Sequence, residues 1–358
     1  MNAHSRQVRV LFRVAAGPRV GFGHLVRAVS LANALGVQPV VSVRGSRGSE
    51  ETARRLGARV LKPGPPLQVL LEARPGVLVV DDRVANATRA WRRAARTIGI
   101  PIVSIHDLGL GLGDADLFVD GSLGAESRWA SESVGRQSVP ALLGPRYAIL
   151  NHRCVTAAGS PRAHTASDVL IALGGGPRSR APRRLASAIL RRRPDVRVSV
   201  AGGFVAPQRR VDTPRIHWVT PAALCTCLAS ATVAIVGGGV TLYETAAIGV
   251  PTVAVAVVLS QRPTVRAFAA AGATIDGGEL PGPAASRGVV NGIAERVLCL
   301  LDDAEKQRRL SRTARTLIDG GGASRVATAI HQLVVSRSSA NSSILENREC
   351  VSRKAASR

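Results

Sequence analysis

Aromatic residues are scarce in this chain of 358 residues. They make up 3% of the sequence, while the hydrophobic fraction is 46%, so the cores must consist mainly of Ala, Val, Leu and Ile. Small aliphatic side chains of this kind suit strands that are covered by helices. The shortage of Phe, Tyr and Trp also argues against a surface on which nucleic-acid bases stack.

Lysine is nearly absent although the formal net charge is +24. Only Lys62, Lys306 and Lys354 are lysines, so almost all of the positive charge is arginine. The arginines are spread along the chain, and we therefore expect no specific nucleic-acid partner, although a basic surface attracts anionic sugar nucleotides. The charge leaves one alternative open, a non-catalytic protein that binds sugar nucleotides or nucleic acid.

The chain also lacks paired cysteine motifs, a signal peptide and a membrane-spanning run. The five cysteines are Cys154, Cys225, Cys227, Cys299 and Cys350. Their number is odd and none form CxxC pairs, so we expect reduced thiols and no metal site. The charged N-terminus has no apolar run, and the longest apolar stretch, Val250–Leu259, is too short to cross a bilayer. These absences predict a cytoplasmic protein, with peripheral membrane contact only if its acceptor is lipid-linked.

Short apolar strands alternate with helices in two successive series. This alternation predicts an α/β fold with two doubly wound, Rossmann-like domains that face each other across a cleft. We expect an N-terminal domain over residues 1–150, a linker over 151–167, a C-terminal domain over 168–335 and a disordered tail over 336–358. Ligands of such sheets bind outside the carboxyl ends of the strands.

The first candidate site is the loop Gly21-Phe22-Gly23-His24, which follows the first strand and opens the first helix. Glycines at Gly21 and Gly23 let the backbone approach a ligand, and a helix start favours a diphosphate or sugar hydroxyl. The spacing is not that of a dinucleotide-binding GxGxxG motif. His24 is the natural general base near neutral pH, and a capping or structural histidine is the alternative.

The second candidate site is the segment Gly237–Glu244, which again joins a strand to a helix. Gly238, Gly239 and Thr241 form a plausible anion nest. Glu244 lies one turn into the helix, where its carboxylate could accept two hydrogen bonds from ribose hydroxyls. The alternative is a glycine turn followed by an acidic residue that complements the helix dipole.

Less specific candidates follow other strand ends or close the first domain. They are Asp81, Asp82, Arg146, Gly175 and Gly176. The two aspartates could be cleft acids, and the glycines form a third loop after a strand. Arg146 could touch a phosphate or brace the linker. For His106 and Asp107, at another strand end, a structural role is at least as expected.

Taken in order, these segments resemble one family. The set GFGHLVR, DD, LLGPRYAIL, LIALGGG and GGGVTLYETAAIGVP is similar to the UDP-sugar hydrolases of pseudaminic acid synthesis and the related spore-coat polysaccharide biosynthesis proteins. Those enzymes have the glycosyltransferase-B fold and are similar to the family that adds N-acetylglucosamine to lipid-linked muramyl peptide. The resemblance spans roughly Val8 to Val335.

The resemblance implies a reaction and a site. Water would attack the anomeric carbon of a UDP-sugar and release UDP, with His24 as base. Arg27 matches the arginine of the motif and would contact the substrate. In the second motif Gly238, Gly239 and Thr241 would face the diphosphate, and Glu244 would hold the ribose. No cofactor or metal is implied, because backbone N–H groups and arginine can neutralise the diphosphate.

Three segments depart from the family pattern. The loop after the first strand has no acidic residue, the strand-end triplet is Asp81-Asp82-Arg83 rather than Asp-His-Tyr, and Pro177 follows the third glycine loop directly. These departures put the substrate in doubt. A glycosyltransferase that uses the same donor with a sugar or lipid acceptor is therefore the alternative to hydrolysis.

Overall fold

The computed structural model describes most of the chain. The described residues are 8–18, 20–108, 114–132, 139–157, 168–174, 180–204, 215–280 and 285–337. Gly175 and Gly176, the expected third loop, lie outside them, as do 158–167 of the expected linker and 338–358 of the expected tail.

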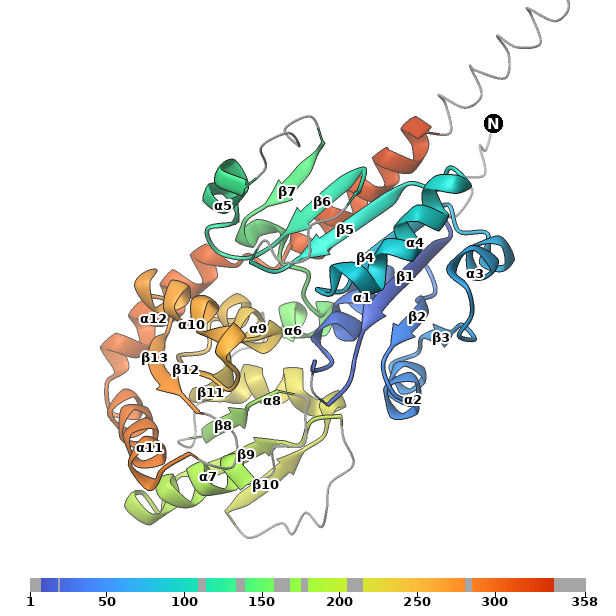
Figure 1. The fold of residues 1–358 in the computed structure, drawn as a ribbon. Coiled ribbons are helices and arrows are strands. Elements are labelled where there is room, and N and C mark those ends of the chain that lie inside the picture. Colours follow the sequence, from blue (N-terminus) through green and yellow to red (C-terminus); the bar gives the residue numbers. More distant parts are fainter. Residues whose placement is uncertain are drawn as a thin grey trace, which may run out of the picture.

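A parallel sheet of seven strands forms the first domain, in the order β3-β2-β1-β4-β5-β6-β7 (Figure 1). The strands are β1 (Val10–Ala15), β2 (Val40–Arg44), β3 (Arg59–Val60), β4 (Val77–Asp81), β5 (Ile102–His106), β6 (Leu117–Asp120) and β7 (Ala141–Leu143). The helices between them are α1 (Gly23–Ala34), α2 (Arg47–Arg55), α3 (Pro66–Ala73), α4 (Ala85–Thr97) and α5 (Ala125–Glu132). All paired strands run parallel.

A second parallel sheet has six strands in the order β10-β9-β8-β11-β12-β13. They are β8 (Asp168–Ala172), β9 (Arg197–Ala201), β10 (Ile216–Val219), β11 (Val233–Gly237), β12 (Thr252–Ala256) and β13 (Ile275–Glu279). The helices are α6 (His152–Ala157), α7 (Arg180–Arg192), α8 (Leu224–Ser230), α9 (Val240–Ile248), α10 (Arg262–Ala270), α11 (Arg287–Leu301), α12 (Ala304–Leu317) and a last helix over 322–337.

Both sheets are covered on both faces, which explains their apolar strands. In the first domain α1 and α2 pack on one face and α3 and α4 on the other. In the second domain α7 and α11 cover one face, and the other carries α8, α9 and α10. A strand that is buried on both faces, such as β4 with its sequence VLVVD, needs apolar residues at successive positions. The expected α/β fold of two Rossmann-like domains is confirmed.

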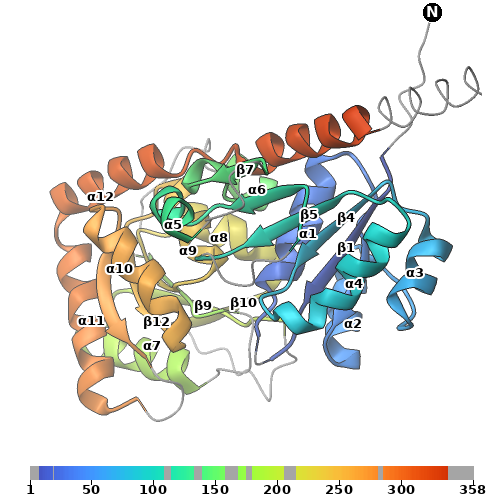
Figure 2. The same ribbon diagram turned by 45° about the horizontal axis from the view of Figure 1, so that its top comes forward.

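The last helix leaves the second domain and packs on the first. Ala323, Val326 and Ile330 belong to the core around β1 and α1, and Figure 2 shows this red helix running along the first domain. The sequence-based boundary placed residues up to 335 in the second domain. The position of the last helix differs from this expectation. The amphipathic pattern of a helix shows that one of its faces is buried, but not which sheet that face covers. Residues 336 and 337, expected in the tail, continue this helix.

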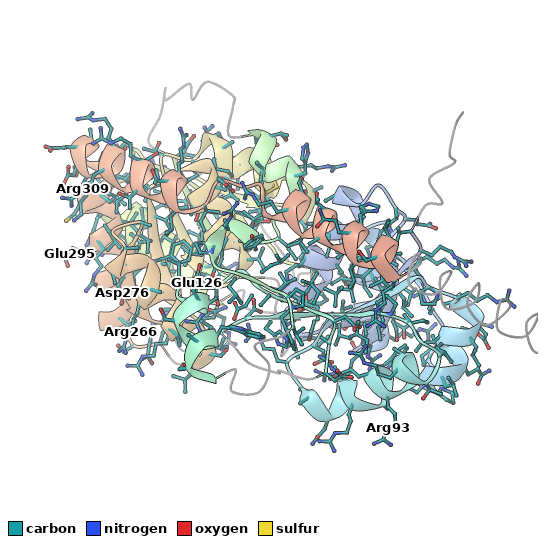
Figure 3. The ribbon with its side chains drawn as sticks, turned by 90° about the horizontal axis from the view of Figure 1, so that it is seen from above. Arg93, Glu126, Arg266, Asp276, Glu295 and Arg309 are labelled. Carbon is teal, nitrogen blue, oxygen red and sulfur yellow. A yellow bond between two sulfur atoms is a disulfide. The ribbon has the colours of Figure 1, made fainter. Side chains whose placement is uncertain are left out.

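The charge is distributed over both domains. Figure 3 shows exposed Arg93 on α4, Arg266 on α10 and Arg309 on α12 pointing away from the sheets, with acidic Glu126 and Glu295 on other outer helices. Within the described ranges, no helix has both the length and the apolar character needed to cross a membrane.

Candidate functional site

A cavity of about 1060 Å³ is lined by residues from both domains. This volume lies just above the usual range for ligand sites, about 300–1,000 Å³. Loops at the carboxyl ends of β1, β5, β8 and β11 contribute to its lining, as expected for parallel sheets. The cavity brings the two candidate loops together. Its lining includes Gly21, Gly23, His24, Arg27, Gly238, Gly239, Thr241 and Glu244.

Two helix starts meet at this cavity. A Cβ atom placed on Gly23 would lie 3.3 Å from Cγ2 of Val240, so the first residues of α1 and α9 are in contact. The first N–H groups of a helix have no acceptor within the helix, and the helix dipole adds positive partial charge there. The cavity is therefore a favourable place for an anion such as a diphosphate.

The imidazole of His24 is held by the carboxylate of Asp81. Its Nδ1 atom is 2.7 Å from Oδ1 of Asp81, the last residue of β4, and both side chains are buried. A carboxylate can only accept, so in a neutral imidazole this contact favours the tautomer with the proton on Nδ1. In that tautomer Nε2 carries the lone pair. Such an orientation is the one required of a histidine that removes a proton from a hydroxyl or water.

Arg27 lies one turn further along α1 and joins two carboxylates. Its Nε donates to Asp81 Oδ2 at 2.7 Å, and its NH1 donates to Asp107 Oδ1 at 2.6 Å. NH2 lies within hydrogen-bonding distance of both aspartates and of His24 Nδ1. The guanidinium is thus occupied by protein groups. Its geometry favours a role in organising the site over the direct substrate contact that the motif implies.

The ion pairs decide the charges in this cluster. Burial raises the pKa of Asp81, but Arg27 and His24 outweigh it and the net shift is downward. Burial also raises the pKa of Asp107, and Arg27 and Arg83 more than offset this, so that its pKa lies well below the usual range. Both carboxylates are ionised at neutral pH. The positive charge of Arg27 is equally secure, because its pKa lies above its ordinary value despite burial.

The second-domain loop presents backbone rather than charged side chains. The N–H groups of Gly238 and Gly239 donate to carbonyls of Val255 and Gly237, at 3.1 Å and 2.8 Å. Among the described residues, no backbone acceptor is bonded to the N–H groups of Val240 and Thr241 at the start of α9, and both residues line the cavity. Gly238 serves another purpose. A Cβ atom there would lie 2.9 Å from the carbonyl oxygen of Gln261, so only glycine fits.

Glu244 is buried in the wall of the cavity. Burial raises the pKa of its carboxyl to about 7, although a hydrogen bond from the backbone N–H of Asn151 acts in the opposite direction. Asn151 belongs to the segment that crosses between the domains. Next to it on α9, the hydroxyl of Tyr243 interacts with the backbone of Leu123 in the first domain. Helix α9 therefore contacts both the crossing segment and the opposite domain.

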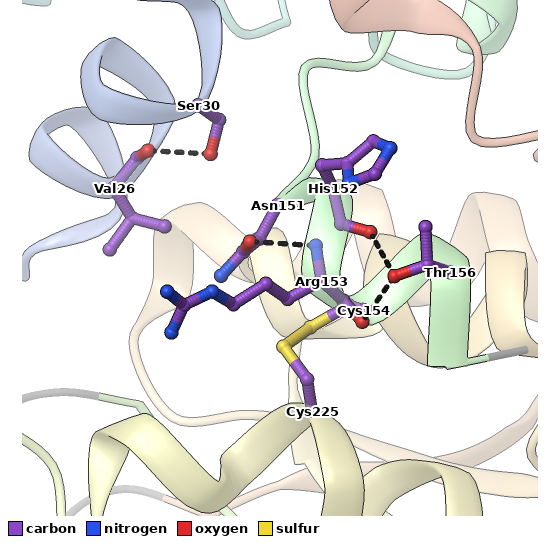
Figure 4. Close-up of a disulfide and its surroundings, with 8 residues drawn as sticks. All are labelled: Val26, Ser30, Asn151, His152, Arg153, Cys154, Thr156 and Cys225. Carbon is purple, nitrogen blue, oxygen red and sulfur yellow. Dashed lines mark hydrogen bonds between the residues drawn. A yellow bond between two sulfur atoms is a disulfide. The ribbon is translucent and has the colours of Figure 1, made fainter. Parts of the chain in front are cut away.

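A disulfide lies at the edge of the cavity. Cys154 in α6 and Cys225 in α8 are bonded, and both residues line the cavity (Figure 4). The expectation of reduced thiols is therefore wrong for these two cysteines. Their sequence positions, 71 residues apart, gave no sign of a pair, and the fold brings them together by packing α6 against α8. Cys227 and Cys299 carry free thiols.

Two predicted site residues lie away from the cavity lining. Asp82 accepts two hydrogen bonds from Arg44, at 2.6 Å and 2.7 Å, and one from the backbone of Val84. Arg146 is exposed, and its guanidinium lies 5.3 Å from the ring centre of Tyr147. The structure gives both residues structural contacts. Asp81 is also absent from the lining, but it reaches the site through His24.

Sequence reasoning gave too little weight to the residues between the motifs. Asp107 comes directly after β5 and Asp81 is the last residue of β4, so a position at a strand end was the available signal. Asn151 and Arg153 line the cavity from the stretch assigned to a linker, where no periodicity marked them. Figure 4 shows the Arg153 side chain extending between α1 and the disulfide. In the described part of the chain, no group of three or more His, Cys, Asp or Glu residues could hold a metal ion.

Known structures were compared with the chain. No protein-family model and no curated protein matches it. The spinosyn rhamnosyltransferase SpnG bound to the spinosyn aglycone is 20% identical, over 90% of this chain and 99% of that one, with a TM-score of 0.59. MurG from Acinetobacter baumannii is 14% identical over 90% and 99%, with a TM-score of 0.59. MnaA from S. aureus, solved with UDP, is 14% identical over 90% and 96%, with a TM-score of 0.58.

At these identities the likeness concerns the fold. The overall fold, with its two parallel-sheet domains, is similar to these structures over about nine-tenths of the chain. The chain has the glycosyltransferase-B fold.

Proposed function

We propose that this protein is an enzyme that breaks the bond between the anomeric carbon of a sugar and a nucleoside diphosphate, UDP in the first instance. The observation that carries the proposal is the position of the His24–Asp81 pair, which shares one cavity with the start of α9. A base and an anion site in one cavity are the two elements that such a reaction requires.

The second domain would hold the nucleotide. The N–H groups of Val240 and Thr241 and the dipole of α9 would bind the diphosphate. Glu244 would accept hydrogen bonds from the ribose hydroxyls, and Arg153 at the cavity edge would add positive charge. These groups also stabilise the negative charge that develops on the leaving diphosphate, which lowers the barrier to bond cleavage.

The first domain would supply the base. His24 Nε2 takes the proton from an attacking O–H group while the oxygen bonds to the anomeric carbon. The bond from that carbon to the diphosphate oxygen breaks, and its electron pair leaves with UDP. Asp81 stabilises the imidazolium that forms. Attack from the side opposite to the leaving group inverts the anomeric centre.

Hydrolysis is the first candidate, because the segment GFGHLVR is similar to the motif of the UDP-sugar hydrolases. Glycosyl transfer is the second. Arg83, Leu108 and Ser122 of the first domain also line the cavity, whose volume of about 1060 Å³ leaves room for an acceptor larger than water. The resemblance to a rhamnosyltransferase in overall fold is compatible with this candidate.

One experiment tests the enzyme proposal and separates the two candidates. Purified protein is incubated with a panel of UDP-sugars, first alone and then with sugar or lipid-linked acceptors, and UDP release is followed. Release without acceptor is the result expected of the hydrolase, and release only with acceptor is that of the transferase. Replacing His24 by Gln should lower turnover about 10²- to 10⁴-fold in either case. No release under any condition would overturn the proposed function.

A further inference from the structure

His24 Nδ1 lies between two groups with opposite requirements. Asp81 Oδ1 is 2.7 Å away and can only accept a hydrogen bond, whereas Arg27 NH2 is 3.1 Å away and can only donate one. In a neutral imidazole, pairing with Asp81 places the proton on Nδ1 and leaves Nε2 as a base. Pairing with Arg27 places the proton on Nε2, and Nε2 then cannot accept a proton from the substrate.

Two carboxylates hold the Arg27 guanidinium beside this nitrogen. Asp81 accepts from Nε at 2.7 Å and from NH2 at 2.5 Å, and Asp107 accepts from NH1 at 2.6 Å and from NH2 at 3.2 Å on the opposite side. Arg83 in turn donates to Asp107 Oδ2 at 2.9 Å and fixes that carboxylate from the cavity side. Charge-assisted bonds of this kind are about twice as strong as neutral ones, so they can decide the orientation of the guanidinium.

We infer that Asp107 is a positioning residue that selects the base-competent tautomer of His24 by anchoring Arg27. The inference rests on the proposed function, because it concerns the group that would remove the proton. It assigns a role to a side chain that lies at a strand end on the cavity wall and touches neither the imidazole nor the nucleotide side. Asp81 orients the ring and accepts from Arg27 NH2, and Asp107 anchors the other edge of the guanidinium through NH1 and NH2.

The test reads the tautomer directly, in free protein without substrate. Long-range ¹H–¹⁵N spectra distinguish the two protonated forms of an imidazole, and His24 is assigned among the seven histidines by the signal lost in His24→Gln. The wild-type protein should show proton on Nδ1. Asp107→Asn keeps the shape but removes the charge, and it should move most of the population to the Nε2–H form. Asp107→Glu should retain the wild-type form.

Two further variants make the test specific. The double variant Arg27→Met/Asp107→Asn removes the competing donor as well, and it should return the proton to Nδ1. It also removes one charge of each sign, so it serves if Asp107→Asn does not fold. Asp168→Asn breaks a similar two-bond pair with Arg197 at the start of β8 and should leave the His24 signals unchanged.

The kinetic readout should agree with the spectra. In Asp107→Asn, kcat should fall at least about tenfold while KM and UDP affinity stay within about twofold, because the nucleotide contacts are untouched. The inference is overturned if Asp107→Asn keeps the wild-type tautomer, if the double variant fails to restore it, or if the wild type is protonated on Nε2. A protein that releases no UDP would overturn the proposed function, and the tautomer measurement would still stand.

Discussion

The two helix starts at the cavity have the same place in their domains and are built in opposite ways. At α1 the site consists of charged side chains, with His24, Arg27, Asp81 and Asp107 joined by hydrogen bonds of 3.2 Å or less. At α9 it consists of backbone, with glycines already bonded to carbonyls and N–H groups left for a ligand. A titrating base needs partners that fix its proton, whereas an anion needs donors that do not change with pH.

The means that hold the two sites in place differ as well. Side-chain ion pairs join strand ends to α1 in the first domain. In the second domain the crossing segment is joined to α8 by the Cys154–Cys225 disulfide and to α9 through Glu244. Side-chain networks respond to single substitutions and to pH, while covalent and backbone contacts should respond to reductants and to steric change. Each half of this comparison can be tested.

Reduction of the disulfide should have the largest effect on stability. The Cys154–Cys225 bond closes a loop of 71 residues. Loss of that constraint should lower the free energy of unfolding by about 4 kcal/mol in the chain-entropy model. Urea unfolding with and without a dithiol measures the difference. A Cys154→Ala/Cys225→Ala double variant should have the unfolding free energy of the reduced protein, and adding the dithiol should not change it. Equal stability of the oxidised and reduced wild type would show that the disulfide does not stabilise the second-domain side of the cavity.

Glu244 should make stability depend on pH. The pKa of its carboxyl is about 7 in the folded protein, against the ordinary value of 4.5 that applies in the unfolded chain. The folded protein therefore binds this proton more tightly. The contribution of this group to stability is therefore greatest below pH 4.5 and is lost as pH rises through 7, by about 3 kcal/mol. The difference in unfolding free energy between wild type and Glu244→Gln, measured from pH 5 to 8, should show this slope. A difference that is constant with pH would mean that the carboxyl is not desolvated.

Gly238→Ala should weaken nucleotide binding by about tenfold, equivalent to about 1.4 kcal/mol. The new Cβ would lie 2.8 Å from Val265 Cγ2 and 2.9 Å from the carbonyl of Gln261, so the start of α9 must move away from α10. UDP titration by calorimetry measures the change. Gly288→Ala, near the start of α11, is the matched control, because the atom nearest to the new Cβ would be Oγ of Ser286, 3.7 Å away. Unchanged affinity in Gly238→Ala would argue against a backbone-built anion site.

The sequence was informative where a pattern is local. Strand ends such as Asp81 and glycine-to-helix junctions such as Gly237–Thr241 were found from periodicity and composition. β13 was missed because its sequence, IDGGE, has no apolar alternation, and α6 was missed inside a stretch read as linker. The partners of Arg27 lie 54 and 80 residues away, so their pairing depends on strand order and side-chain rotamers. The hydrophobic periodicity of the sequence carries no information on strand order or on side-chain rotamers.

Arg146 should show the smallest effect, although its position in a motif made it a candidate phosphate contact. It is exposed, stacks on Tyr147 and lies outside the cavity lining, and its carbonyl accepts from Arg325 whatever side chain is present. Arg146→Ala should change the free energy of unfolding by less than about 0.5 kcal/mol and UDP affinity by less than about twofold. Arg153→Ala, at the cavity edge, is the informative partner variant and should weaken UDP binding. If Arg146→Ala weakened it more, the anion site would extend beyond the start of α9 to the end of the first domain, and charged side chains would contribute to nucleotide binding in both halves.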